Sequence, residues 1–286
     1  TEVAETDRCI SWLPWYHDMG LVGCFLSPIA NQMSADYLKT EDFARRPLAW
    51  IDMISRNPGT SCSYSPTFGY DICARRISSQ SNVAERFDLS RWRIAGNGAD
   101  MIRPDVMQGF VNAFAPAGFK ASAFLPSYGL AEATLAVTLM PPGEGIRVEL
   151  VEEERLSGAQ RDLSRPARYR AIVNCGKAVK DMALEIRGAR GEVLGDHQIG
   201  KVWCRGPSVM VGYFRDPEAT EAWQKVLQLA MEARELNRVN GELIQIRMQF
   251  TTKALEALGG AKNSLELYGP DGQSRPTSSG RLFGSA

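Results

Sequence analysis

From Arg91 to Gly129 the sequence is RWRIAGNGADMIRPDVMQGFVNAFAPAGFKASAFLPSYG, in which two kinds of local pattern alternate. Arg91–Ala95 and Ala121–Leu125 have the length and apolar composition of buried strands. Pro104–Phe114, which lies between them, is predicted to be a helix. Because strands that alternate with helices are typical of helix-covered parallel sheets, the stretch predicts an α/β fold with a mainly parallel sheet.

Two loops are predicted to leave these strands at their carboxyl ends. Gly96–Asp100 follows the first strand, and Pro126–Gly129 follows the second, before a further helical run from Leu130. In α/β folds, ligands bind at the loops that leave the carboxyl ends of parallel strands. The two loops therefore mark the place where a binding site is expected.

The same alternation extends upstream, whereas the downstream sequence changes character near Pro141. Predicted upstream elements are the strands Cys9–Leu13 and Ser61–Tyr64 and the helices Phe43–Arg56 and Pro66–Ile77. Beyond Pro141, an acidic run at Val148–Leu156 and an arginine-rich run at Arg161–Arg170 indicate an irregular surface excursion. The strands then expected are Ala171–Cys175, Met182–Ile186 and Lys201–Arg205, arranged as a meander.

A third type of sequence begins at about Trp223. Apolar residues from Leu236 onward are spaced alternately three and four apart, which predicts a long amphipathic helix suited to a helical partner. Gly259 and Gly260 end that pattern, and the rest is rich in Gly, Ser and Pro, as in disordered tails. The predicted domains are 1–140 (α/β), 141–223 (β-rich) and 224–286 (helix and tail).

Composition excludes several classes of function. Lys+Arg and Asp+Glu both number 33, so no net charge favours nucleic acid or an anionic membrane as a partner. The six cysteines form no Cys-x-x-Cys pair and only two histidines accompany them, which argues against zinc and for a reduced, cytoplasmic protein. No apolar run approaches the roughly 20 residues that span a bilayer. Because a strand follows Thr1 so closely, we expect the chain to begin inside a domain.

Leu125–Thr134, LPSYGLAEAT, carries the clearest chemical pattern. Tyr128 at a strand end offers a flat face for a base, and Gly129 allows close approach. Glu132 is a hard oxygen ligand of the kind that suits Mg²⁺ beside phosphate. A Tyr-Gly turn followed by an exposed glutamate would explain the same residues without any ligand, and for a lone motif that explanation is the commoner one.

Two further segments accompany this motif. Ser11–Leu21 holds His17 beside Asp18 among aromatic residues, where an imidazole could orient a carboxylate or stabilise developing charge. A single such histidine is more often a core residue. Gly200–Thr220, taken alone, predicts only a strand, a turn and the start of a helix.

In this order the three segments resemble the core motifs of the adenylate-forming superfamily, which comprises acyl-CoA synthetases, luciferases and peptide-synthetase adenylation domains. Within it, four segments are most similar to fatty acyl-AMP ligases: Leu13–Leu21, Tyr70–Ile77, Asn97–Asp100 and Tyr128–Thr134. The resemblance covers about residues 1–223. It implies the adenylation of a fatty acid by ATP with Mg²⁺.

The resemblance also implies roles for individual residues. His17 would line the acyl site beside the reacting carboxylate. The loop against adenine would consist of Asn97, Gly98, Ala99 and Asp100. Tyr128 would stack on adenine beside Gly129 and Leu130, and Glu132 would help hold Mg²⁺. Two departures are Ala131, where many relatives have threonine, and Lys201, which replaces an acidic residue.

Other features of the resemblance bear on activity. The excursion after Pro141 resembles the insertion by which these ligases disfavour the thioester step, which implies release of acyl-AMP or transfer to an acyl carrier protein. No Ser/Thr/Gly-rich phosphate loop, ribose-binding aspartate or lid lysine is found in the sequence. Because the groups that would stabilise the triphosphate are missing, we expect this chain to be inactive alone.

The C-terminal segment resembles a different family. Leu236–Ile244 and Leu267–Gln273 are similar to flagellar export chaperones that escort hook-associated proteins, although any amphipathic helix with a loose tail would share these features. Three functions therefore stay open: an enzyme fragment, a chaperone-like module, and a remnant that binds nucleotide without turnover. We expect one apolar face of the helix to find no place on the α/β body: Leu236, Val239, Leu243, Ile246 and Phe250.

Overall fold

The computed structural model describes residues 3–77, 82–153, 156 and 167–215. All described residues up to Tyr213 belong to one compact unit, and Phe214 and Arg215 fall outside it. The predicted amphipathic helix and tail at 224–286 lie outside the described residues, and so does most of the arginine-rich run. The predicted domain limits at 140 and 223 therefore stay predictions.

A seven-stranded sheet forms the centre of the fold, in the order β2-β1-β3-β4-β5-β6-β9. The first five strands of that order pair in parallel, and β6 and β9 are added antiparallel at one side. The strands are β1 (Asp7–Ser11), β2 (Ser34–Tyr37), β3 (Thr60–Ser65), β4 (Trp92–Asn97), β5 (Phe124–Gly129), β6 (Ala136–Leu139) and β9 (Lys177–Ala178). The predicted mainly parallel α/β sheet is confirmed.

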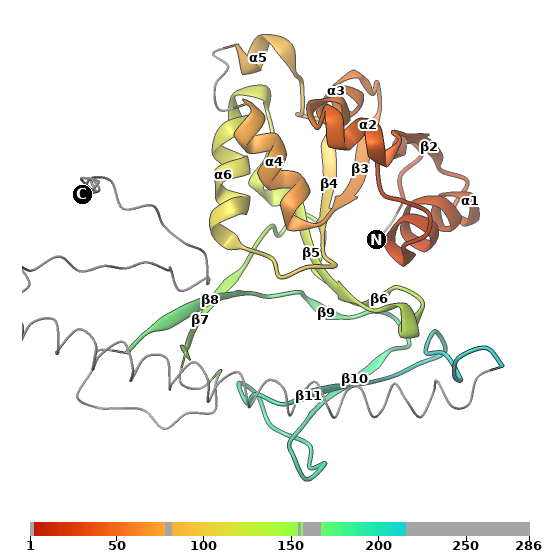
Figure 1. Cartoon of the computed structure of the whole chain (residues 1–286), viewed down its shortest axis with the longest axis vertical. Helices are drawn as coiled ribbons and strands as arrows, with labels where there is room; N and C mark the ends of the chain where they lie inside the picture. The colour runs from red at the N-terminus through yellow and green to blue at the C-terminus, as the bar shows by residue number, and fades with distance from the viewer. Residues whose placement is uncertain (1–2, 78–81, 154–155, 157–166, 216–286) are drawn as a thin grey trace, which may run out of the picture. The chain divides into compact units, whose positions relative to one another are not determined.

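Helices α3 (Leu48–Arg56), α4 (Thr67–Ile77) and α6 (Pro104–Phe114) lie together beside this sheet (Figure 1). Helix α6 has the predicted limits. It begins at Pro104, whose ring presets the backbone angle of a first helical turn. Its buried residues share one side of the helix and join the main hydrophobic cluster of the molecule: Val106, Met107, Phe110 and Phe114.

The helix predicted over Phe43–Arg56 is two helices, α2 (Thr40–Arg45) and α3. Pro47 separates them because a proline disfavours helical backbone in the residue before it. Arg46 accordingly leaves the helical region, with φ −138° and ψ 73°. The minor helices are α1 (Ser27–Ala30) and α5 (Val83–Arg86).

The helix predicted from Leu130 is wrong. A single 3₁₀ turn, η4 (Ala131–Ala133), is followed at once by strand β6, which pairs antiparallel with β5. Thr134 ends the turn with a φ of 68°, a value that no right-handed helix can continue. Pairing with the end of β5 therefore overrides the local helical spacing.

Beyond β6 the chain forms two antiparallel pairs (Figure 1). Strand β7 (Val148–Glu152) pairs with β8 (Tyr169–Val173), and β10 (Ala183–Arg187) pairs with β11 (Lys201–Arg205). The predicted strands are present, but the expected meander is wrong because β8 pairs backwards with β7 rather than forwards with β10. The acidic run, which was expected to be irregular, supplies β7.

Other sequence expectations concern cysteines and membranes. All six cysteines are free thiols, and four of them are buried. Among the described residues, no helix combines the length and the apolar character needed to cross a bilayer.

Candidate functional site

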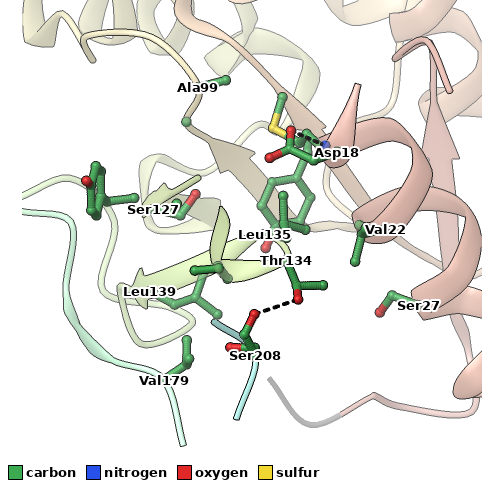
Figure 2. A pocket seen from close by; sticks show the side chains of 18 of the residues that line it. Asp18, Val22, Ser27, Ala99, Ser127, Thr134, Leu135, Leu139, Val179 and Ser208 are labelled. Carbon is green, nitrogen blue, oxygen red and sulfur yellow. Dashed lines mark hydrogen bonds between the residues drawn. The ribbon is translucent and has the colours of Figure 1, made fainter. Parts of the chain in front are cut away.

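A cavity of about 860 Å³ opens beside the carboxyl ends of β4 and β5 (Figure 2). One part of its wall is the π-helix η1 (Met19–Leu26), and another is the turn between β5 and β6. Six residues predicted for the site line this one cavity: His17, Gly98, Ala99, Tyr128, Gly129 and Leu130. Sites of this size that hold small molecules are usually apolar with a few polar groups, and this cavity has that character.

His17 lies two residues before η1, and its side chain is 49% exposed. Its Nδ1 lies 2.7 Å from Oδ1 of Asp18, and the N–H of Met19 donates to the same oxygen at 2.7 Å. The N–H of Met19 also donates to Nδ1 at 3.2 Å, so Nδ1 acts as an acceptor and Nε2 is the ring nitrogen that remains for a ligand.

The predicted adenine loop divides into two pairs of residues. Gly98 and Ala99 line the cavity, and Ala99 has a φ of 69°, which is uncommon outside glycine. Asn97 is instead fully buried within β4, where its Nδ2 donates to the carbonyl of Ser65 at 3.2 Å. Asp100 accepts from the N–H of Thr67 at 2.9 Å and so caps the start of α4. These two residues contribute to the framework and do not line the cavity.

Tyr128 lies at the end of β5 and is 41% exposed, so one side of its ring can still be covered by a ligand. Burial, with smaller contributions from Cys204 and Glu132, raises the pKa of its phenol. Gly129 is required at the next position because an added Cβ would lie 1.9 Å from the carbonyl oxygen of Leu135. The predicted base-stacking residue is therefore held by a turn that only glycine permits.

A strained turn follows, and the sequence did not reveal it. Thr134 has φ 68° and ψ −51°, and the N–H of Leu135 donates to the carbonyl of Ala133 at 2.8 Å. These values describe a γ-turn of the rare type, with a β-branched residue at its centre. Backbone strain of this kind is concentrated at functional sites. Nothing in a threonine among alternating apolar residues signals it.

Glu132, the predicted Mg²⁺ ligand, does not line the cavity. Its Oε1 accepts a hydrogen bond from the hydroxyl of Tyr213 at 3.0 Å, and its carbonyl accepts from the N–H of Met210 at 2.8 Å. The described residues contain no group of three potential metal ligands. One carboxylate nevertheless suits Mg²⁺, which usually keeps several waters and takes its remaining ligands from substrate phosphates.

The charged residues of the cavity wall that the sequence did not predict include an ion pair. Asp7 and Arg93 form an ion pair across β1, β3 and β4, and the hydroxyl of Thr60 donates to Asp7 at 2.7 Å. The Asp7 side chain is only 1% exposed. Arg93 is the one charged residue in the strand β4. That isolated charge was the feature of the sequence that could have indicated a buried ion pair.

The rest of the wall is mostly apolar. It comes from η1, from the sheet face, from the β5–β6 turn and from the segment after β9, as Figure 2 shows for Val22, Leu135, Leu139 and Val179. Such a surface releases ordered water when it is covered by a hydrocarbon chain. The cavity thus joins an apolar wall to an exposed aromatic ring and an imidazole.

Known families match both parts of the chain. A family described as AMP-binding enzyme matches residues 1–214, and one described as FlgN protein matches residues 210–276. The second match covers less than a quarter of the chain.

Curated relatives support the first match. A putative acyl-CoA synthetase of Caulobacter vibrioides is 51% identical over 77% of this chain and 38% of its own length. The medium-chain-fatty-acid–[acyl-carrier-protein] ligase of Moorena producens is 34% identical over 74% of this chain and 36% of its own. The chain thus spans less than two fifths of the length of these relatives.

Solved structures agree with the relatives. A fatty acyl-adenylate ligase from a study of the E. coli and L. pneumophila enzymes matches with a TM-score of 0.70 and 41% identity, over 77% of this chain and 40% of that one. The L. pneumophila ligase in complex with acyl adenylate and pyrophosphate matches with a TM-score of 0.67 and 33% identity, over 76% and 38%. The chain therefore belongs, over residues 1–214, to the family of AMP-binding enzymes.

Proposed function

We propose that this chain is part of an ATP-dependent fatty acid adenylating enzyme of the cytoplasm, and that it holds the acyl-adenylate side of the site. The observation that carries this proposal is the single cavity shared by His17, the Gly98–Ala99 turn, Tyr128 and an apolar wall. The relatives include ligases named for fatty acids and for acyl carrier protein. An acyl carrier protein is accordingly the proposed acceptor.

In this proposal each group of the cavity has a separate task. Tyr128 offers its exposed ring to adenine while Gly98 and Ala99 border the base. The apolar wall at Val22, Leu135 and Leu139 covers the acyl chain and excludes water from it. Nε2–H of His17 donates to the acyl carboxylate, since Nδ1 accepts from the N–H of Met19.

Glu132 supplies one oxygen for Mg²⁺, and the phosphates and water supply the others. Bound there, the ion would neutralise the charge of the phosphates. Asn97 and Asp100 support the site through β4 and α4 and make no ligand contact in this proposal. We further propose that these residues bind an adenylate without turning it over, so that ATP–pyrophosphate exchange stays at background.

Replacing Tyr128 with alanine will weaken the binding of a non-hydrolysable dodecanoyl-sulfamoyl adenosine about tenfold or more. The expected loss corresponds to roughly 1–3 kcal/mol for one base stacked on an aromatic ring. Isothermal titration calorimetry on the full chain measures the dissociation constant. Tyr128→Phe is the matched control, because it keeps the ring and should bind as the unaltered chain does. Equal binding by Tyr128→Ala, or no binding by any form, would contradict the proposal.

A second candidate function rests on the match of residues 210–276 to FlgN protein. We propose that the predicted apolar face of this segment, here called the apolar seam (Leu236, Val239, Leu243, Ile246 and Phe250), binds a flagellar hook-associated protein. Leu243→Glu combined with Ile246→Glu will abolish that binding in a pull-down with the purified partner, because charge on an apolar seam prevents its burial. The matched control is Gln245→Glu, a charge introduced outside the seam. Binding that survives the double substitution would remove this candidate.

A further inference from the structure

The segment Gly206–Tyr213 is tied to the turn that carries Glu132. The N–H of Met210 donates to the Glu132 carbonyl at 2.8 Å, and the hydroxyl of Thr134 donates to the carbonyl of Ser208 at 2.8 Å (Figure 2). A third bond runs from the Tyr213 hydroxyl to Oε1 of Glu132 at 3.0 Å. The first two bonds end on backbone atoms, whereas the third acts on the carboxylate itself.

We propose that Tyr213 is a positioning residue that orients the Glu132 carboxylate for Mg²⁺, an inference that rests on the proposed function. A carboxylate has two oxygens, and Tyr213 engages only Oε1. Among the described residues, Oε2 accepts no hydrogen bond, so it is the oxygen available to a cation. The terminal torsion of a glutamate is broad and otherwise leaves the carboxylate free to turn.

The contact joins residues that are 81 positions apart in the sequence. Tyr213 is able to hold the carboxylate because its own segment is anchored to the same turn by the two backbone bonds. The strained γ-turn at Thr134 adds a reason for that anchoring, since its hydroxyl makes one of these bonds. Strained conformations persist where surrounding contacts determine them, and this turn is bonded to the segment Gly206–Tyr213 at both Glu132 and Thr134.

A purely structural role for the tyrosine is the competing explanation, and the two roles differ in how they depend on the metal. Tyr213→Phe retains the ring and both backbone bonds and removes only the hydroxyl. If Tyr213 positions the carboxylate, its loss will weaken binding only when Mg²⁺ is present. If Tyr213 holds the segment in place, its loss will weaken nucleotide binding equally with and without the ion.

Titration of the full chain with ATP, once in Mg²⁺ and once in EDTA, distinguishes these cases. The dissociation constant in EDTA divided by that in Mg²⁺ gives the gain in ATP affinity that the metal provides. Both values are first corrected for the affinity of free ATP for Mg²⁺. We expect Tyr213→Phe to lower this ratio about tenfold, as loss of a hydrogen bond to a charged group implies, and to leave the EDTA value within about twofold. Tyr169→Phe is the matched control, since Tyr169 also donates to a glutamate, Glu152, at 3.4 Å, outside the cavity.

Other results of these titrations would contradict either the role of Tyr213 or the metal role of Glu132. An unchanged ratio in Tyr213→Phe, or equal weakening in both buffers, overturns the positioning role while the metal role of Glu132 stands. Glu132→Gln tests that metal role separately and should bring the ratio close to one. If the unaltered chain shows no gain from Mg²⁺, or if Glu132→Gln keeps the gain, the proposed metal site itself is wrong and the inference fails with it.

Discussion

Replacement of Arg93 by alanine will lower the free energy of unfolding by about 3 kcal/mol, because it leaves a buried carboxylate without its counter-charge. Asp7 is 1% exposed and accepts bonds from Arg93, from the Thr60 hydroxyl at 2.7 Å and from the Ala4 N–H at 2.8 Å. Breaking a buried ion pair usually costs about 3–5 kcal/mol, and we expect the lower end of that range because the Arg93 side chain is 30% exposed. Urea denaturation followed by circular dichroism measures the change.

The effect will depend on pH. Burial alone would raise the pKa of Asp7, but the bonds from Arg93, Thr60 and Ala4 together hold it below its ordinary value of 3.8. A lowered folded-state pKa contributes stability above the ordinary value, and that contribution disappears as the pH falls through the folded-state pKa. The difference in the free energy of unfolding between the unaltered chain and Arg93→Ala will therefore have its full value at pH 7 and will become smaller below about pH 4.

Arg56→Ala is the control for this experiment. Arg56 and Asp52 form an exposed pair one helical turn apart at 3.4 Å, and such pairs contribute about 0.5 kcal/mol or less. Equal effects of the two substitutions, or a pH-independent effect of Arg93→Ala, would show that the buried pair does not stabilise the fold in this way.

Replacement of Trp50 by alanine will cost about 3–5 kcal/mol, the usual loss for a large aromatic in a well-packed core. Trp50 is fully buried on α3, and its ring makes edge contacts with those of Tyr70 at 5.4 Å and Trp92 at 5.3 Å between centroids. Its indole N–H also donates to the Ser63 hydroxyl on β3 at 2.8 Å. The residue thus joins the helical layer to the sheet.

The matched control is Trp203→Ala. Trp203 lies on β11, is 51% exposed and has the Arg187 guanidinium over its ring at 4.6 Å. Its loss should cost about 1 kcal/mol or less, the worth of an exposed cation–π contact. Far-UV circular dichroism during urea denaturation reports both variants without relying on tryptophan emission. A loss at Trp50 no larger than that at Trp203 would contradict the described core.

Local patterns in the sequence predicted much of the framework. The limits of α6 are as predicted, because Pro104 starts the helix and its apolar residues share one side. Strands β3 and β4 lie within one or two residues of their predicted ends. The roles assigned to His17, Tyr128 and Glu132 rest on residue chemistry and on resemblance to a family, and they stay predictions.

Other features depend on partners that are distant in the chain. The helix expected after Leu130 is a strand because β6 pairs with β5, and that pairing outweighs local spacing. Asn97 and Asp100 belong to the framework because the first is enclosed within β4 and the second caps α4. Neither outcome is visible in a window of neighbouring residues.

By itself, then, the sequence determined the alternation of strands and helices and the presence of a Tyr-Gly turn after a strand, since both depend on residues close together in the chain. Only the tertiary structure placed Asp7 against Arg93, 86 positions away, and Tyr213 against Glu132, 81 positions away. The physical reason is that hydrogen bonds and ion pairs act over a few ångströms in space. Which side chains come within that distance is decided by strand order and packing rather than by spacing along the chain.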